Sequence, residues 1–110
     1  MRLYLSGAIS NNPAYLDQFN TAQDILQQLG YENIINPANI CMSMPADAQY
    51  SDYMNVCREL FSMADALVQL PGWELSLGAN RELGWAEAHD LIITSFEELA
   101  KGGALNDRRG

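Results

Sequence analysis

The side chains best suited to chemistry lie in three short segments of the chain: Tyr4 to Asn12, Pro71 to Gly78, and a helical stretch that carries Arg81 and Glu82. Glu82 stands beside an apolar helix face and offers a carboxylate, a group that serves as a nucleophile or moves protons. Two structural roles compete with chemistry at this position, an interaction with the helix dipole and an ion pair with Arg81. The residue type alone leaves these alternatives open.

The glycines and the histidine restrict the kinds of site that the chain can build. Gly7 follows the first apolar run and permits a tight turn there, but a single glycine does not make a phosphate-binding loop. Neither Gly-x-Gly-x-x-Gly nor Gly-x-x-x-x-Gly-Lys-Ser/Thr occurs, which excludes nucleotide binding through those two motifs. His89 is the sole histidine and its place near a helix end is explained by the helix dipole, so we expect no metal site.

Strands and helices that alternate along the chain must position these residues. Short apolar runs predict four strands, at Leu3 to Leu5, Tyr31 to Asn36, Ala66 to Leu70 and Leu91 to Thr94. Apolar residues at helical spacing predict helices between them, from Pro13 to Leu29, Ser51 to Ala64 and Gly78 to His89. This order predicts an α/β domain of the three-layer Rossmann-like (flavodoxin-like) class, with a four- or five-stranded, mainly parallel sheet. Ligands of such sheets bind beyond the carboxyl ends of the strands.

Several boundaries follow from local signals. Asn11-Asn12-Pro13 predicts a cap and first turn for the first helix, and Gly30 predicts its end. The stretch from Ala38 to Gln49 shows no period and predicts a loop over the sheet that covers a ligand. Residues 95–110 predict a short helix at Phe96 to Ala100 followed by a frayed tail.

Length, charge and cysteine content set the wider frame. A chain of 110 residues predicts one domain, residues 1–110, and its apolar runs are far too short to span a membrane. The first residues do not resemble a signal peptide, so we expect a cytoplasmic protein in which Cys41 and Cys57 are reduced thiols. The net charge of -8 predicts that the chain repels nucleic-acid polymers, although a single nucleotide in a local pocket remains possible.

Two separated motifs carry a resemblance to a known family. The string from Gly78 to Ala86, GANRELGWA, is similar to the Gly-x-x-x-Glu-Leu-Gly-x-Ala signature of the nucleoside 2-deoxyribosyltransferase superfamily. The opening Leu3-Tyr4-Leu5-Ser6-Gly7 resembles the first strand of that superfamily. The resemblance covers residues 2–94 and is closest to a small phage and bacterial branch with the pattern found here from Leu70 to Ala79.

The resemblance implies roles for individual residues. Glu82 would be the nucleophile, Tyr4 would hydrogen-bond its carboxylate, and Gly7 would approach the sugar. Ser76 occupies a position where transferases of the superfamily carry aspartate and the 2'-deoxynucleoside 5'-phosphate N-hydrolases carry serine. The resemblance therefore implies a 5'-monophosphate substrate, held by Ser76, Ser10 and the backbone at Gly7 and Gly78. Ser76 is also expected to cap its helix, and one serine can both cap a helix and bind a phosphate.

Cys57 departs from the pattern of the characterised enzymes. It stands where they generally carry an aspartate that contacts the leaving base, and the hydrolases' serine and arginine in the first loop are Ala8 and Ser10 here. Without the resemblance, the helical spacing predicts that Cys57 is a small apolar residue on the buried face of its helix. Two hypotheses follow from the resemblance: cleavage or transfer at the N-glycosidic bond of a nucleoside 5'-monophosphate, or a non-catalytic nucleotide-binding module. The resemblance also implies a homo-oligomer and a reaction that requires no metal or organic cofactor.

Overall fold

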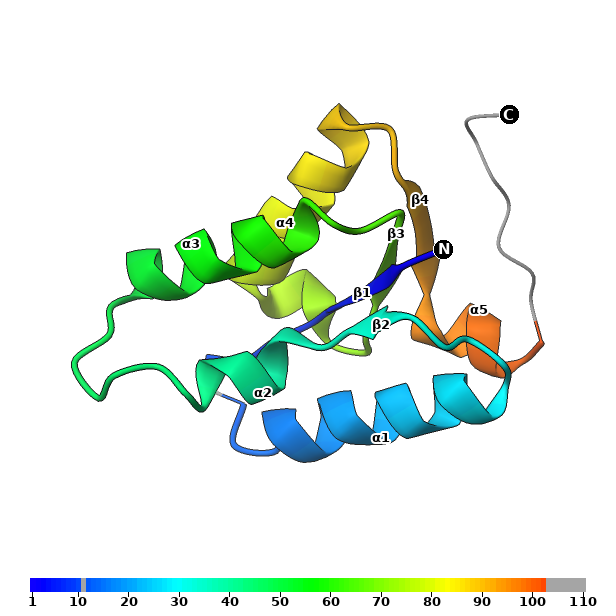
Figure 1. Cartoon of the computed structure of the whole chain (residues 1–110), viewed down its shortest axis with the longest axis horizontal. Helices are drawn as coiled ribbons and strands as arrows, with labels where there is room; N and C mark the ends of the chain where they lie inside the picture. Colours follow the sequence, from blue (N-terminus) through cyan, green and yellow to red (C-terminus); the bar gives the residue numbers. More distant parts are fainter. Residues whose placement is uncertain (11, 103–110) are drawn as a thin grey trace.

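A computed structural model describes residues 1–10 and 12–102 of the chain. Within them a four-stranded, all-parallel sheet in the order β2-β1-β3-β4 lies between two layers of helices (Figure 1). The strands are β1 (Leu3–Ser6), β2 (Ile34–Ile35), β3 (Ala66–Gln69) and β4 (Ile92–Ser95). The helices are α1 (Tyr15–Gln28), α2 (Pro37–Cys41), α3 (Tyr50–Phe61), the 3-10 turn η1 (Trp73–Leu75), α4 (Leu77–Ala88) and α5 (Phe96–Ala100). The predicted three-layer Rossmann-like class is confirmed.

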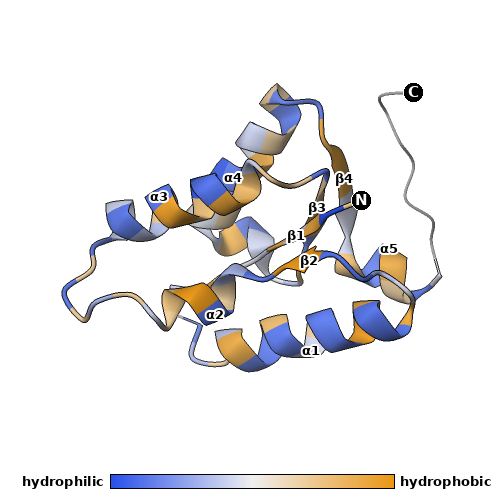
Figure 2. Ribbon diagram, viewed as in Figure 1, coloured by the Kyte–Doolittle hydropathy of each residue, from blue (hydrophilic) through white to orange (hydrophobic). Residues whose placement is uncertain are grey.

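Each face of the sheet has its own hydrophobic core. Leu5 of β1 belongs to the cluster that α1 and α5 cover, with Phe19 and Leu99 from those helices. Tyr4, the next residue to Leu5, belongs to the opposite cluster with Phe61 of α3 and Ala86 of α4. This alternation follows from the period of two along a strand. In Figure 2 the strands are mainly orange, whereas α1 shows much of its visible surface in blue, as a half-buried helix should.

The predicted strands and helices all exist, but several of their bounds differ. β2 covers only Ile34–Ile35 of the predicted strand at residues 31–36, and α3 ends at Phe61, three residues before the predicted end. α1 begins at Tyr15 rather than Pro13, because the side chain of Asn12 accepts a hydrogen bond from the Ala14 amide and holds a turn before the helix. Asn11 lies outside the described residues. Gly30, with a φ of 102°, follows the end of α1 as predicted, and α5 coincides with the predicted short helix.

The prediction of a loop from Ala38 to Gln49 was partly wrong, because helix α2 covers the first part of this stretch. The Asn36-Pro37 pair, which ends the strand, also starts this helix. The side chain of Asn36 accepts a hydrogen bond from the Ala38 amide. Pro37 occupies the first helical turn, where a backbone N–H would have no acceptor within the helix, so the missing N–H of proline costs nothing. α2 is five residues long, too short for a period to show in the sequence.

The strand order places the functional edge. The chain leaves β1 toward β2 on one side and later returns to add β3 and β4 on the other side. The carboxyl ends of β1 and β3 therefore flank the point where the strand order reverses, the usual place for ligands in open α/β sheets. No helix among residues 1–10 and 12–102 is both long and apolar enough to cross a membrane.

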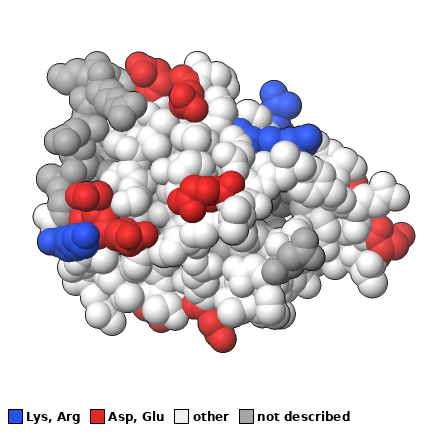
Figure 3. Space-filling model, turned by 180° about the vertical axis from the view of Figure 1, so that it is seen from behind, with Lys and Arg blue, Asp and Glu red and all other residues white. Residues whose placement is uncertain are grey.

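Acidic residues outnumber basic ones, 14 to 6. Figure 3 shows carboxylates at several separate places on the back face of the molecule. This charge distribution is consistent with the expectation that nucleic-acid polymers are repelled, which stays a prediction.

Candidate functional site

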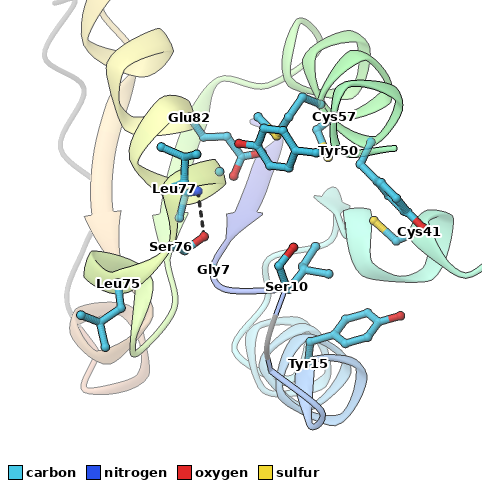
Figure 4. Close-up of a pocket in the computed structure, with 15 residues that line it drawn as sticks. Gly7, Ser10, Tyr15, Cys41, Tyr50, Cys57, Leu75, Ser76, Leu77 and Glu82 are labelled. Atoms are coloured by element: carbon cyan, nitrogen blue, oxygen red, sulfur yellow. Dashed lines mark hydrogen bonds between the residues drawn. The ribbon is translucent and has the colours of Figure 1, made fainter. Parts of the chain in front are cut away.

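A pocket with a volume of about 640 Å³ opens at the carboxyl ends of β1 and β3 (Figure 4). Its walls come from the loop after β1, from α2 and α3, and from the segment that joins η1 to α4. The predicted site residues that line it are Gly7, Ser10, Cys57, Ser76, Gly78 and Glu82. Tyr4 lies behind Glu82 in the core, fully buried. Segments far apart in the sequence therefore meet in one cavity.

Glu82 is a buried carboxylate on the inner side of α4. Only 5% of it is exposed, and each of its carboxylate oxygens accepts a hydrogen bond. The Tyr4 hydroxyl donates to Oε2, and the Ser6 hydroxyl donates to Oε1 at 2.7 Å. Neither an ion pair with Arg81 nor the helix dipole accounts for this geometry, because both donors come from β1. The two hydroxyls fix the orientation of the carboxylate toward the pocket.

The surroundings of Glu82 change its acidity. Burial raises its pKa from 4.5 to about 7, against the hydrogen bonds from Tyr4 and Ser6, which favour the charged form. The pKa of Tyr4 is raised well above 10, because burial and the nearby charge of Glu82 both disfavour a phenolate. Tyr4 thus remains a hydrogen-bond donor, and Glu82 exists at neutral pH both as a carboxylate and as an acid. A carboxylate in this state can attack carbon or exchange a proton.

The raised pKa of Glu82 predicts how stability depends on pH. The folded chain holds the Glu82 proton more tightly than the unfolded chain, so its stabilising effect is complete below pH 4.5 and is lost as the pH rises through about 7. Across this range the free energy of unfolding should fall by about 3 kcal/mol from this group alone. Urea unfolding of the wild type and Glu82→Gln at a series of pH values isolates the effect. If the free energy of unfolding changed with pH in the same way for both proteins, the raised pKa of Glu82 would be contradicted.

Tyr4→Phe tests the hydroxyl that holds Glu82. The substitution removes a hydrogen bond to a charged acceptor, worth about 1 to 3 kcal/mol, and with it an interaction that lowers the pKa of Glu82. We expect the titration of Glu82, followed through the pH dependence of unfolding in urea, to move to higher pH. Tyr31→Phe, outside the pocket, is the control. An unchanged pH profile in Tyr4→Phe would speak against this role.

Gly7 is required by packing and not by an unusual backbone angle. A β-carbon added there would lie 3.1 Å from Cβ of Leu70 and 3.4 Å from the ring of Phe19. The glycine therefore lets the loop after β1 pass close to the end of β3, which brings its backbone to the edge of the pocket.

Hydroxyl and amide groups gather on one side of the pocket. The Ser76 hydroxyl oxygen accepts a hydrogen bond from the Ala79 amide at 3.1 Å and caps α4, which leaves its own proton free to donate. The first amides of α4 point toward the same place, since helix N-termini lack internal acceptors. Gly78 lies beside them, and a β-carbon there would be 3.8 Å from the Tyr50 hydroxyl. Ser10 faces this group across the cavity in Figure 4.

The opposite wall, formed by α2 and α3, carries sulfur and aromatic groups. Cys57 is 6% exposed on α3, as its place on the buried stripe of the helix predicts, and it also lines the pocket. Cys41 of α2 lines the same wall, and both thiols are free. A hydrogen bond with Cys57 lowers the pKa of Cys41, whereas that bond and burial raise the pKa of Cys57.

Several residues of the site, in the pocket lining or behind Glu82, were not predicted from the sequence. Ser6 was overlooked, although the period of two along β1 puts it on the same face as Tyr4 and could have revealed it. No sequence pattern indicated that Cys41 belongs to the site, because it lies in the stretch predicted as a loop. The aromatic lining was also missed and consists of Tyr15, Tyr50 and Tyr53.

Arg81 and Trp85 have structural partners. The Arg81 guanidinium lies 5.3 Å from the centre of the Tyr50 ring, a cation–π contact at the pocket wall. Trp85 packs edge-on against Phe61 at 5.6 Å and is a packing residue of the core on this face of the sheet. Among residues 1–10 and 12–102, no three His, Cys, Asp or Glu side chains cluster as metal ligands.

The fold and the pocket define a class: a small Rossmann-like domain with a buried carboxylate at the strand edge where parallel-sheet proteins bind ligands. Residues 1–95 match the family described as a domain of unknown function, DUF4406, and the chain belongs to that family. No curated protein matches the chain.

Proposed function

We propose that the domain cleaves or transfers the N-glycosidic bond of a nucleoside or deoxynucleoside 5'-monophosphate through a covalent intermediate on Glu82. The observation that carries the proposal is the buried Glu82 carboxylate, oriented by Tyr4 and Ser6 and exposed only toward a pocket of nucleotide size. The resemblance of the GANRELGWA motif and of the first strand to the nucleoside 2-deoxyribosyltransferase superfamily supports the same role for Glu82.

The reaction follows the double displacement of retaining glycosidases. A Glu82 oxygen forms a bond to C1' of the sugar while the bond from C1' to the base nitrogen breaks, and its electron pair leaves with the base. Water or a second base then attacks C1' and releases the carboxylate, with the proton of the water passing to solvent. Tyr4 and Ser6 hold the carboxylate in place and stabilise it each time that it is charged. No metal or organic cofactor takes part in this scheme.

The hydroxyl side of the pocket would bind the 5'-phosphate. Ser76, Ser10 and the first amides of α4 supply neutral donors, and the helix N-terminus supplies positive potential. The sugar would then lie over Gly7 with C1' near Glu82, and the base against the wall of α2 and α3. Each part of a nucleotide thus meets groups of matching chemistry.

A non-catalytic nucleotide-binding module is the second candidate, because the wall against the base presents Cys57 where a proton donor for the leaving base would stand. One assay separates the two. The purified chain is incubated with nucleosides and nucleoside 5'-monophosphates, and free base is measured by chromatography. Released base identifies an enzyme, whereas binding without release identifies the module.

The 5'-phosphate site makes a separate prediction. Monophosphates should bind about 10-fold or more tightly than the matching nucleosides, since two or more hydrogen bonds to a charged group are gained. Ser76→Ala should remove much of this preference. Ser95→Ala is the matched control, because Ser95 caps α5 through an equal 3.1 Å bond to the Glu98 amide. Equal affinities for nucleoside and monophosphate, by calorimetry at one ionic strength, would rule out the phosphate site.

We also propose that the chain forms a homo-oligomer and works in the cytoplasm. Leu75 is 94% exposed and Leu77 is 62% exposed, and both line the rim of the pocket, where a second copy would cover them. The free thiols of Cys41 and Cys57 suit a reducing compartment. Analytical ultracentrifugation gives the number of subunits.

A further inference from the structure

The wall that would face the base carries no strong proton donor. Among the described residues that line the pocket, Glu82 is the single carboxyl group, and the other dissociable protons belong to tyrosines and to the thiols of Cys41 and Cys57. The acids of α3 do not reach the cavity. Asp52 is exposed and accepts a hydrogen bond from the Gln49 amide at the start of the helix, and Glu59 is exposed outside the pocket.

This composition matters because of what leaves when the glycosidic bond breaks. A neutral purine or pyrimidine departs as an anion unless it is protonated, and a positioned acid contributes about 10²- to 10⁴-fold to such a step. A base that already carries a positive charge on the glycosidic nitrogen behaves differently. It takes the electron pair of the broken bond and departs as a neutral molecule, so that no proton is needed.

The same pocket offers favourable contacts to a cationic ring. Glu82 supplies a carboxylate, and the polarisable sulfur atoms of Cys41 and Cys57 line the wall that would face the base. Tyrosine rings line the cavity, and aromatic faces attract cations. Tyr50 already holds the Arg81 guanidinium over one face at 5.3 Å. The described residues that line the pocket include no Lys or Arg; Arg81 lies outside this lining, against the Tyr50 ring.

We propose that the preferred substrate class is a nucleoside 5'-monophosphate whose base is a positively charged ring bonded to C1' through its quaternary nitrogen, as in an N-ribosylpyridinium nucleotide. The inference rests on the proposed function of Glu82 and deepens it. The Glu82 carboxylate bonds to C1', and the electron pair of the bond from C1' to nitrogen stays on the ring, which becomes a neutral pyridine. Water then displaces the carboxylate from C1' and gives up one proton to solvent.

Matched substrates test this inference on the wild-type chain. Nicotinamide mononucleotide is compared with its reduced dihydropyridine form, which keeps the sugar, phosphate and ring size but lacks the charge. Adenosine 5'-monophosphate serves as the nucleotide with a neutral base. The 2'-deoxy forms of nicotinamide mononucleotide and of adenosine 5'-monophosphate are included in case the protein accepts only deoxyribose. Chromatography measures released base and sugar phosphate, with Glu82→Gln as the blank. We expect the pyridinium nucleotide to be cleaved about 10² to 10⁴ times faster than its neutral counterparts, the range that a missing acid would impose on them.

The outcomes separate this inference from the proposed function. Faster release of adenine than of nicotinamide, or equal rates, would overturn the preference for a cationic base and leave Glu82 catalysis in place. Release of no base from any substrate would overturn both proposals. Rapid cleavage of the reduced form would likewise overturn the inference, because that substrate has the same shape without the charge.

Discussion

Glu82→Gln is expected to lower base release by about 10⁴-fold or more while the chain stays folded. Glutamine keeps the size of the side chain, but an amide oxygen is a poor nucleophile and cannot form the glycosyl ester. The fold should tolerate the change, because the hydroxyls of Tyr4 and Ser6 can each donate or accept a hydrogen bond. Chromatographic detection of free base measures the loss.

Glu87→Gln is the matched control, since Glu87 lies on the exposed side of the same helix, α4. Urea unfolding at pH 8 should show Glu82→Gln to be at least as stable as the wild type, because it removes a buried charge that is costly there. A folded Glu82→Gln protein with near-wild-type turnover would eliminate the covalent mechanism.

Cys57→Asp should raise the rate of release of neutral bases by about 10²- to 10⁴-fold. The residue lines the wall against which the base would lie, and aspartate would provide the proton donor that this wall lacks. The difference in cleavage rate between nucleotides with neutral bases and pyridinium nucleotides should therefore become smaller. Rates for both substrate types, measured side by side, give the ratio.

The design must account for folding, because Cys57 is only 6% exposed and a carboxylate there is costly unless it is solvated or paired. Circular dichroism and urea unfolding come before kinetics. Cys57→Asn is the matched control, since it has the shape of aspartate without an acidic proton. A folded Cys57→Asp protein that binds nucleotide yet gains no activity would favour the non-catalytic module.

The sequence by itself determined the order of the elements and the edge at which the site lies. Apolar runs such as Ala66 to Leu70 and helical spacing in residues 51–64 are local patterns, and local patterns encode the period of each element. Strand and helix alternation then restricts the topology to a parallel sheet with covered faces, which the structure confirms. The segments that carry Gly7 and Ser76 follow from that topology, because they come after β1 and β3, whereas the resemblance singles out the two residues themselves.

Only the tertiary structure decided how the site is built. Ser6 and Glu82 are 76 residues apart, and no local pattern specifies that their side chains meet at 2.7 Å. Cys41 reaches the wall of Cys57 only because the short helix α2 folds beside α3. The pKa of Glu82 depends on how much water the whole pocket excludes, a property of packing between distant segments. Periodicity is local and can be read along the chain, whereas burial and contact depend on all the layers together.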